Sequence, residues 1–223
     1  MQISKANTED EMNNKFSLRK TNGGVLSKQR IIEYMNVSEI KERLIVTPLL
    51  DSEESLDPSS INVRLGNEFI VMKKQSFPIL DISDTNELSR NIDKYQERIR
   101  IDYGDKFILH PSQLVIGSTF EYISLPTSLM CYVIGKSSWG RMGLIIATAT
   151  KVDPGFKGAI TLEIINEGEV PVVLYPGVPI AQLVFHEMSD TSGTYMGQYS
   201  YATGPEFPDF SKKNDKWSFW YKK

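Results

Sequence analysis

The chain has 223 residues, of which 40% are hydrophobic and 24% are charged, and its formal net charge is −3. This composition is typical of a globular protein, and the acidic balance excludes a broad nucleic-acid-binding face while leaving room for a small anion pocket. No stretch contains the ~18 apolar residues that a membrane helix needs, and residues 1–20 hold no signal-peptide core. We therefore expect a cytoplasmic protein with neither nucleic acid nor membrane as a partner.

The chain contains one cysteine, Cys131, and two histidines, His110 and His186. One cysteine cannot form an intramolecular disulfide, which is consistent with a reducing compartment. Its place in the apolar run LMCYVIG predicts a buried small side chain rather than a nucleophile. Because one cysteine and two histidines cannot supply a usual zinc site, the sequence predicts no metal centre.

The N-terminal part of the chain is predicted to be a polar extension followed by helix. Residues 1–24 are polar and end in two glycines, so we expect a flexible extension. Ser27 is a suitable N-cap for a helix that begins at Lys28, and a second helical turn is predicted to begin within residues 37–40.

Beyond residue 60 the pattern changes to short strands separated by Pro and Gly turns. Apolar and polar residues alternate with period two and no helices intervene, which is typical of an antiparallel sandwich or barrel. Residues 82–105 are charged and weakly patterned, and we expect a surface insertion with a short helix there. The segments predicted as strands are 61–72, 106–110, 113–125, 129–135, 143–150, 158–165, 170–175 and 179–188.

The part of the chain after residue 190 mixes Gly, Ser and Tyr and is predicted to be irregular. Its aromatic content indicates that it packs against another part of the protein. We therefore divide the chain into a flexible extension (1–24), one folded domain (25–205) and an aromatic and basic tail (206–223).

The sequence GKSSWGR, residues 135–141, concentrates hydrogen-bond donors. Lys136 and Arg141 supply cationic groups, and Ser137 and Ser138 supply hydroxyls. Together these are the donors that a polyphosphate requires. Such a cluster is more often a polar turn on the surface, so the donors alone do not identify an anion site.

Glu163 is the candidate general base. In GAITLEIIN its neighbours are apolar, so its carboxylate is predicted to lie in a strand partly removed from water. A carboxylate in such surroundings is suited to take a proton from water. A solvent-facing strand glutamate has the same pattern, and Asp153 in Asp-Pro-Gly-Phe is also typical of a common turn.

Three groups of motifs follow one another in an order that resembles the dCTP deaminase family, within the wider dUTPase superfamily. The resemblance covers about residues 26–205. The motifs are SSINVRLG (59–66), then FILHPSQLVIGSTFEYISLP and GKSSWGRMGL (107–126 and 135–144), then VDPGF, ITLE, YPG and QL (152–156, 160–163, 175–177 and 182–183).

The resemblance implies a mainly β fold with a few short helices, a distorted jelly-roll-like barrel of the dUTPase type. It also implies homotrimers with active sites at the subunit interfaces. The implied ligand is a pyrimidine deoxynucleoside triphosphate accompanied by Mg²⁺, which prefers phosphate oxygens. Zinc is not expected, because zinc-dependent nucleobase deaminases need a set of His and Cys ligands that this chain lacks.

The resemblance further implies roles for individual residues. Glu163 is implied to be the general base, and the carbonyl of Ala149 to help position the water and the amine. Asp153 is implied to hold the 3′-hydroxyl of the sugar, with Phe156 packed nearby. The residues implied to face the triphosphate or the catalytic water are Lys136, Ser137, Ser138, Arg141 and Gln182, and Tyr199 is implied to contact the nucleotide from the tail.

The chain departs from the family pattern at several positions. Lys136 stands where an arginine is usual, which replaces a bidentate fork by a point charge, and Asn62 replaces an aspartate. The tail reads QYSYATGP over residues 198–205 and lacks a lysine and a glutamine that many relatives place against the nucleotide.

Three functions therefore remain open. The first is zinc-independent deamination of dCTP, or of a related cytosine nucleotide, to dUTP and ammonia, which Glu163 favours. The second is a dUTP diphosphatase, or a bifunctional deaminase and diphosphatase, in which Asp153 orients water toward the α-phosphate. The third is a catalytically weak nucleotide-binding regulatory protein, which the changes in the tail favour.

Overall fold

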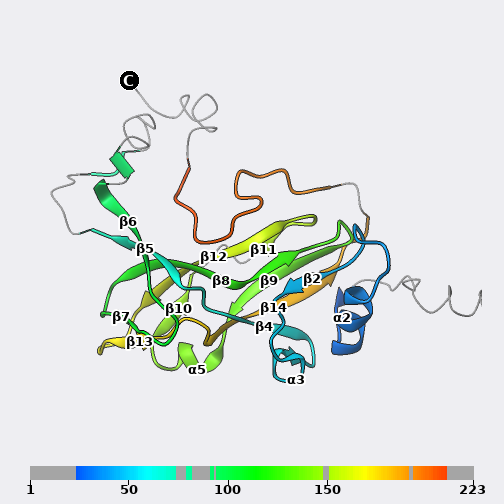
Figure 1. Cartoon of the computed structure of the whole chain (residues 1–223), viewed down its shortest axis with the longest axis horizontal. Coiled ribbons are helices and arrows are strands. Elements are labelled where there is room, and N and C mark those ends of the chain that lie inside the picture. Colours follow the sequence, from blue (N-terminus) through cyan, green and yellow to red (C-terminus); the bar gives the residue numbers. More distant parts are fainter. Residues whose placement is uncertain are drawn as a thin grey trace, which may run out of the picture.

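The structure is a computed structural model that describes residues 24–73, 79–81, 91–92, 94–147, 151–190 and 193–209. Its strands form two large antiparallel sheets and a small third sheet (Figure 1). No helix within these residues is long and apolar enough to cross a membrane. The prediction of a mainly β fold with a few short helices is confirmed.

The first large sheet is called sheet A. In spatial order it consists of β11 (Lys151–Val152), β9 (Leu129–Gly135), β14 (Pro179–Glu187), β4 (Ser60–Arg64) and β3 (Leu56–Asp57), and β1 (Gly24–Val25) also pairs with β14. Because β14 lies between β9 and β4, distant parts of the chain meet on it. Gln182 of β14 lies opposite Ile134 of β9 on one side and opposite Asn62 of β4 on the other.

The second large sheet is called sheet B. In spatial order it consists of β10 (Leu144–Ile146), β12 (Lys157–Asn166), β8 (Leu114–Ser124), β5 (Glu68–Met72) and β6 (Gln96–Arg100), and β2 (Ile45–Thr47) also pairs with β8. The small sheet pairs β7 (Phe107–Leu109) with β13 (Val172–Leu174). Strand β10 pairs with the end of β12 over residues 164–166, and the N–H of Ala147 just after β10 donates to the carbonyl of Glu163 at 2.8 Å.

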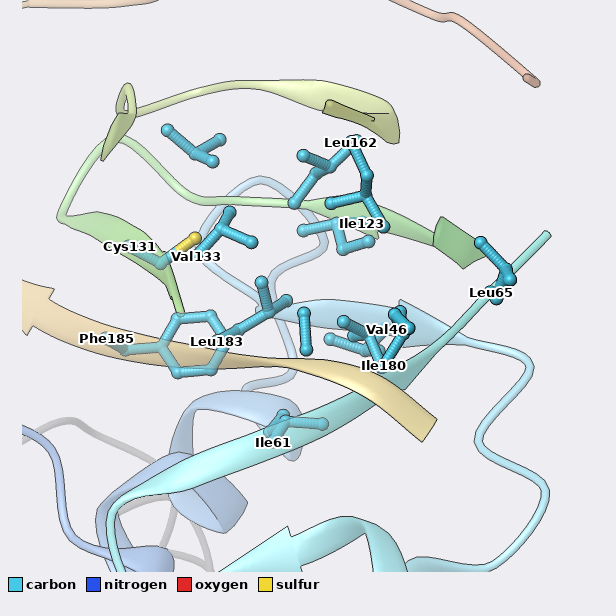
Figure 2. Packing of buried hydrophobic residues seen from close by; sticks show 14 of the residues in the cluster. Val46, Ile61, Leu65, Ile123, Cys131, Val133, Leu162, Ile180, Leu183 and Phe185 are labelled. Atoms are coloured by element: carbon cyan, nitrogen blue, oxygen red, sulfur yellow. The ribbon is translucent and has the colours of Figure 1, made fainter. Parts of the chain in front are cut away.

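The inner faces of sheets A and B bury one hydrophobic core. Along β12, Leu162 and Ile164 are fully buried, whereas Glu163 between them is only half-buried. Leu183 of β14 and Ile61 of β4 join the same core from sheet A (Figure 2). Full burial of a side chain of this size stabilises a fold by roughly 1.5–3 kcal/mol. This alternation decides which residues of each strand face outward, where the candidate site residues lie.

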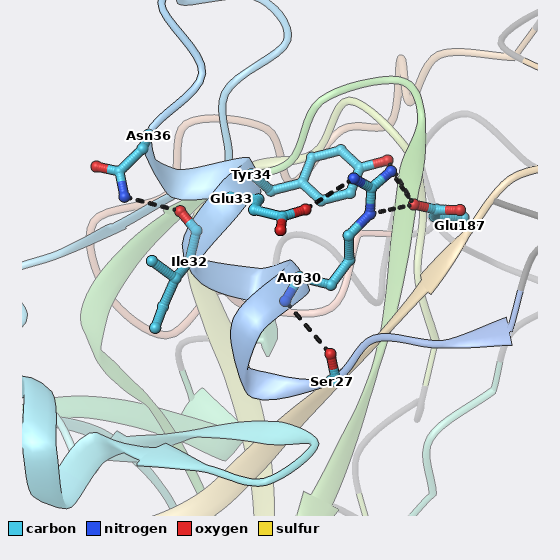
Figure 3. A network of polar contacts seen from close by, with 7 residues as sticks. All are labelled: Ser27, Arg30, Ile32, Glu33, Tyr34, Asn36 and Glu187. Carbon is cyan, nitrogen blue, oxygen red and sulfur yellow. Dashed lines mark hydrogen bonds and ion pairs between the residues drawn. The ribbon is translucent and has the colours of Figure 1, made fainter. Parts of the chain in front are cut away.

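Helix α2 (Lys28–Met35) is held to the end of β14 by a polar network (Figure 3). Oγ of Ser27 accepts a hydrogen bond from the backbone N–H of Arg30 at 3.3 Å, so the predicted N-cap is confirmed. Nη2 of Arg30 lies 2.8 Å from Oε1 of Glu187, and the hydroxyl of Tyr34 donates to the same oxygen at 3.1 Å. Arg30 and Glu187 are largely buried, so this ion pair is shielded from the water that weakens surface pairs.

Most strands lie within the predicted segments, but the short strands β1, β2, β3 and β11 were not predicted, and the prediction for residues 82–105 is wrong in part. Residues 96–100 form the edge strand β6 inside the predicted insertion 82–105, where the sequence QERIR is mostly charged and exposed and shows no apolar alternation. Residues 91–92 and 94–95 are helical, which agrees with the short helix predicted there, and residues 82–90 lie outside the described residues. The second helical turn predicted to begin within residues 37–40 stays a single turn, in which the N–H groups of Glu42 and Arg43 donate to the carbonyls of Glu39 and Ile40.

Two helices were not predicted, α3 (Ser52–Ser55) and α5 (Ser137–Gly140). Each has a single turn, which is too short to show a helical period in the sequence. Cys131 is fully buried in the core, and burial raises the pKa of its thiol, so its predicted packing role is confirmed. The predicted extension lies outside the described residues except for Gly24, and so do residues 210–223 of the predicted tail.

Strand β8 carries an irregularity that sets the register of β12. The pairing between the two strands shifts between Ala159 and Thr161. Oγ1 of Thr119 accepts a hydrogen bond from the N–H of Ile160 at 2.9 Å and donates to the carbonyl of Glu121 at 2.8 Å. These bonds satisfy backbone groups at the bulge, and the pairing beyond it is regular.

Asn166 ends β12 and holds the next loop in place. The side chain is fully buried, and its Nδ2 donates to the carbonyls of Leu109 at 3.0 Å and Val170 at 2.9 Å. Its Oδ1 accepts from the N–H of Gly168 at 2.9 Å. Gly168 packs on Gly143, which has a φ of +86° and where an added Cβ would lie 2.6 Å from the nitrogen of Gly168. Asn166 therefore fixes the loop against which the turn after α5 packs.

Asn166→Ala should lower the free energy of unfolding by about 2–4 kcal/mol, because it leaves two carbonyls and one N–H without their side-chain partner. Urea denaturation followed by tryptophan fluorescence measures this change. Asn67→Ala is the matched control, since Asn67 is only half-buried and its backbone carbonyl makes the bond to Ile101. A loss for Asn166→Ala no larger than for the control would contradict the role given to Asn166.

Candidate functional site

A cavity of about 510 Å³ lies between the outer face of sheet B and the irregular segment 193–209. Its floor includes the apolar side chains of Met72, Leu114 and Ile116, which come from β5 and β8. Four residues with roles implied by the sequence line it, namely Asp153, Phe156, Glu163 and Tyr199. The cavity is therefore the candidate binding site for the nucleoside part of a ligand.

Glu163 lies on the outer face of β12, because its neighbours Leu162 and Ile164 point into the core. Its partner across β8 is Ile116, which also lines the cavity. Oε2 of the carboxylate is itself withdrawn from solvent. A half-buried carboxylate beside an apolar floor is suited to accept a proton from water or from a ligand in the cavity.

Asp153 follows β11 in the turn that leads to β12. Its Oδ1 lies 2.6 Å from Nζ of Lys151, and this hydrogen bond and the charge of Asp153 raise the pKa of Lys151. Lys151 is exposed, so water screens the pair and its contribution to stability is small. Among the described residues the pair engages only Oδ1, which leaves Oδ2 to accept a hydrogen bond from a ligand.

Two of the aromatic rings that line the cavity, those of Phe156 and Tyr195, lie side by side. The ring centroids of Phe156 and Tyr195 are 5.6 Å apart. Gly155 makes this approach feasible, because it has a φ of +77° and an added Cβ would lie 2.7 Å from the side chain of Thr194. Burial raises the pKa of the Tyr195 phenol, so its hydroxyl stays protonated at neutral pH. Such a wall suits the ring of a nucleoside.

The segment 193–209 bonds to β12 at residues 159 and 161, before the residues 164–166 with which β10 pairs. The N–H of Ala159 in β12 donates to the carbonyl of Ala202 at 2.7 Å. The N–H of Glu206 donates to Oγ1 of Thr161 at 3.3 Å. In Figure 1 this orange-to-red segment runs alongside β12. The prediction of an irregular segment that packs on another part of the protein is confirmed for these residues.

Tyr199 takes part in closing the same segment on itself. Its hydroxyl accepts a hydrogen bond from the N–H of Asp209 at 3.3 Å, and Nε2 of Gln198 donates to the carbonyl of Asp209 at 2.9 Å. These bonds join the two ends of residues 198–209 and form a loop that covers one side of the cavity.

Arg98 of β6 fastens this loop to sheet B. Its Nη2 donates to the carbonyl of Pro205 at 2.7 Å, and its Nη1 lies 3.2 Å from Oε2 of Glu68. Its Cζ lies 5.4 Å from the ring centroid of Phe207, which lines the cavity. Gly204 fits beside this pair because an added Cβ there would lie 2.9 Å from Oε2 of Glu68. Arg98 therefore holds one wall of the cavity.

Other predicted residues lie on sheet A and do not line the cavity. Nζ of Lys136 donates to Oδ1 of Asn62 at 2.7 Å. Nε2 of Gln182 donates to the same oxygen at 3.2 Å and to Oδ2 of Asp57 at 2.7 Å. We call Asp57, Asn62, Lys136 and Gln182 the Asn62 cluster. Both donor hydrogens of Gln182 are thus directed at partners within the chain.

Helix α5 begins directly after Lys136. The side chains of Ser137 and Ser138, and that of Arg141 just after the helix, are exposed. Trp139 anchors the turn, since its Nε1 donates to the carbonyl of Pro179 at 2.8 Å. The turn therefore offers two hydroxyls and a guanidinium to a ligand or to a neighbouring molecule.

The described structure thus divides the predicted site residues into two groups. Asp153, Phe156, Glu163 and Tyr199 surround the cavity, whereas Lys136, Gln182 and the α5 residues lie outside it. Ala149 lies outside the described residues. Sequence reasoning missed Asp57 and Arg98, since only the folded strands bring them to their partners. Within the described ranges no group of three or more His, Cys, Asp or Glu residues could hold a metal ion.

Comparison with known proteins points to one family. The profile of the dCTP deaminase-like family matches residues 25–188. A protein named "dCTP deaminase, dUMP-forming" from Methanobrevibacter smithii is 41% identical over 166 residues, which cover 74% of this chain and 81% of that protein. A protein of the same name from Dictyoglomus thermophilum is 36% identical over 202 residues, which cover 86% of this chain and 100% of that protein.

The fold is shared with a solved structure. The 2′-deoxycytidine 5′-triphosphate deaminase from Agrobacterium tumefaciens matches with a TM-score of 0.56 and 20% sequence identity. The match covers 75% of this chain and 49% of that chain. At this identity the similarity shows the fold alone, and it confirms the fold type that the sequence predicted.

Arg98→Gln should loosen residues 204–208, because it removes the ion pair with Glu68 and weakens the bond to the Pro205 carbonyl. Hydrogen exchange followed by mass spectrometry should show exchange at Glu206 and Phe207 faster by about fivefold or more. The core of β12 should exchange as in the wild type.

Arg100→Gln is the matched control for this prediction. Arg100 is an exposed arginine on the same strand and lies opposite Glu68, so its replacement removes the same charge beside Glu68 but leaves the bond from Arg98 to the Pro205 carbonyl in place. Equal exchange rates in the two variants would show that Arg98 does not hold the loop.

Proposed function

This chain belongs to the dCTP deaminase-like family, and we propose that it deaminates dCTP and releases dUMP. Its family consists of hydrolytic enzymes, and two relatives that match most of their own length are named as dUMP-forming dCTP deaminases. The observation that carries the proposal is the position of Glu163, half-buried beside an apolar floor in a cavity that Asp153 and Phe156 also line.

Deamination needs a group that activates water beside the cytosine ring, and we assign this role to Glu163. The carboxylate accepts a proton from water as the oxygen attacks C4 of the base, and the proton passes to the exocyclic amine. The amine leaves as ammonia, so dCTP and one water give dUTP and ammonia. A positioned general base of this kind contributes roughly 10²–10⁴ to the rate.

The proposed end product is dUMP rather than the dUTP expected from the sequence. The names of the relatives support this change, and so does Asp153, which lines the same cavity as Glu163. In the second step Asp153 orients a water toward the α-phosphate, and the bond between the α- and β-phosphates breaks. Two waters are used in all, and dCTP gives dUMP, ammonia and diphosphate.

The phosphate end of the substrate is proposed to bind residues of a neighbouring subunit in a homotrimer. Lys136, Ser137, Ser138 and Arg141 supply the required donors but do not line the cavity of their own chain. Exposed apolar side chains beside them on β9, Tyr132 and Ile134, support a subunit contact at this face. Mg²⁺ is proposed to arrive with the triphosphate, bound to its oxygens.

Glu163→Gln should abolish ammonia release from dCTP while leaving nucleotide affinity within about tenfold of the wild type. The substitution keeps the shape of the side chain and removes the base. Product separation by chromatography measures turnover, and calorimetry with dCTP measures affinity.

Glu169→Gln is the matched control, because Glu169 is an exposed glutamate in the loop after β12. Wild-type turnover in Glu163→Gln would show that Glu163 is not the base. Nucleotide binding by the wild type without either product would instead support a regulatory binding protein.

Asp153→Asn should separate the two steps. We expect diphosphate release to fall at least about 100-fold, since the amide cannot take a proton from water, while ammonia is still released. dUTP should then accumulate in place of dUMP. Asp105→Asn, a change at an exposed turn, is the control. Unchanged dUMP formation in Asp153→Asn would rule out Asp153 as the group that orients the second water.

A further inference from the structure

The side-chain amide of Asn62 forms hydrogen bonds with three partners at the centre of the Asn62 cluster. It lies on β4 opposite Gln182 and is only 8% exposed. Its Nδ2 donates to the backbone carbonyl of Glu54 at 3.0 Å. Its Oδ1 accepts from Nζ of Lys136 at 2.7 Å and from Nε2 of Gln182 at 3.2 Å.

The carbonyl of Glu54 decides which way this amide faces. A carbonyl only accepts hydrogen bonds, so the NH₂ of Asn62 faces it and the oxygen faces the ammonium of Lys136. The carbonyl belongs to helix α3, whose first turn is capped by Asp51 through bonds to two backbone N–H groups. Asn62 is therefore held in one orientation, and it holds Lys136 in turn.

A neutral acceptor at this place leaves Lys136 without a direct ion pair among the described residues, since the carboxylate of Asp57 in the same cluster bonds to Gln182. Asn62 uses one of the three hydrogens of the ammonium, so the others can bind an anion. A carboxylate in its place would neutralise Lys136 and would face the Glu54 carbonyl with no hydrogen to donate.

We propose that Asn62 is a positioning residue that directs Lys136 toward the phosphates of the substrate while preserving its full charge. This inference rests on the proposed function, in which Lys136 binds the triphosphate. It makes the Asn62 amide a determinant of affinity for the phosphate chain and leaves recognition of the nucleoside to the cavity on sheet B.

The test is the isosteric change Asn62→Asp, followed by calorimetry with inorganic triphosphate and, separately, with deoxycytidine. Affinity for triphosphate should fall about tenfold or more, since a charged pair replaces a single neutral contact. Affinity for deoxycytidine should stay within about twofold, because the cavity residues are unchanged. Equal triphosphate affinity in both proteins, or equal loss for both ligands, would overturn the inference.

A double-mutant cycle tests whether Asn62 acts through Lys136. In a Lys136→Met background, Asn62→Asp should cause no further loss of triphosphate affinity, whereas an undiminished loss would show that Asn62 acts by another route. Asn67→Asp is the matched control, because it makes the same change of charge without contacting the cluster.

The variant Asn62→Ala separates the effect of orientation from the effect of charge, and an assay of ammonia release tests the proposed function on its own. Asn62→Ala removes the orientation but adds no charge, so its loss of triphosphate affinity should be smaller than that of Asn62→Asp. A larger loss of triphosphate affinity in Asn62→Ala than in Asn62→Asp would overturn the charge argument. Poor folding of Asn62→Asp could not produce that result, because it would only increase the loss in Asn62→Asp. Ammonia release from dCTP by the wild type tests the proposed function separately, since calorimetry with triphosphate requires no turnover.

Discussion

The packing of sheet A against sheet B is the constraint on which the candidate site depends. Leu162 and Ile164 are buried in the shared core, and this leaves Glu163 facing outward beside the cavity. On the other sheet, Ile61 and Leu183 are buried, and their neighbours along the strands face outward to form the Asn62 cluster. A shift of one residue in the pairing of β12 with β8, or of β4 with β14, would turn these polar side chains toward the core.

The two outward faces differ in chemistry. The cavity on sheet B offers carboxylates and aromatic rings, which suit the amine, hydroxyl and ring of a deoxycytidine. The turn after β9 and the Asn62 cluster offer an ammonium, hydroxyls and a guanidinium, which suit phosphates. A nucleotide needs both sets, and the division between faces is the physical reason for proposing a site shared between subunits.

The C-terminal segment covers the cavity although it lacks the lysine and glutamine expected there from the family resemblance. Backbone bonds tie residue 202 to β12, and Arg98 ties residue 205 to β6. Gln198 and Tyr199 bond to Asp209 and close the loop. The residues that differ from the family pattern therefore have structural partners of their own.

The sequence by itself determined most of the strand segments, the N-cap at Ser27 and the candidate residues Asp153 and Glu163, because alternation and turn chemistry are local properties. It could not reveal β6 as a strand, since Ile99 is the one apolar residue of QERIR and a strand period cannot be recognised from it. Only the tertiary structure decided that Arg98 meets Pro205 and that Asn62 meets Lys136 and Gln182. These contacts join residues 74 to 120 positions apart, and such pairings depend on sheet order and register, which local patterns do not encode.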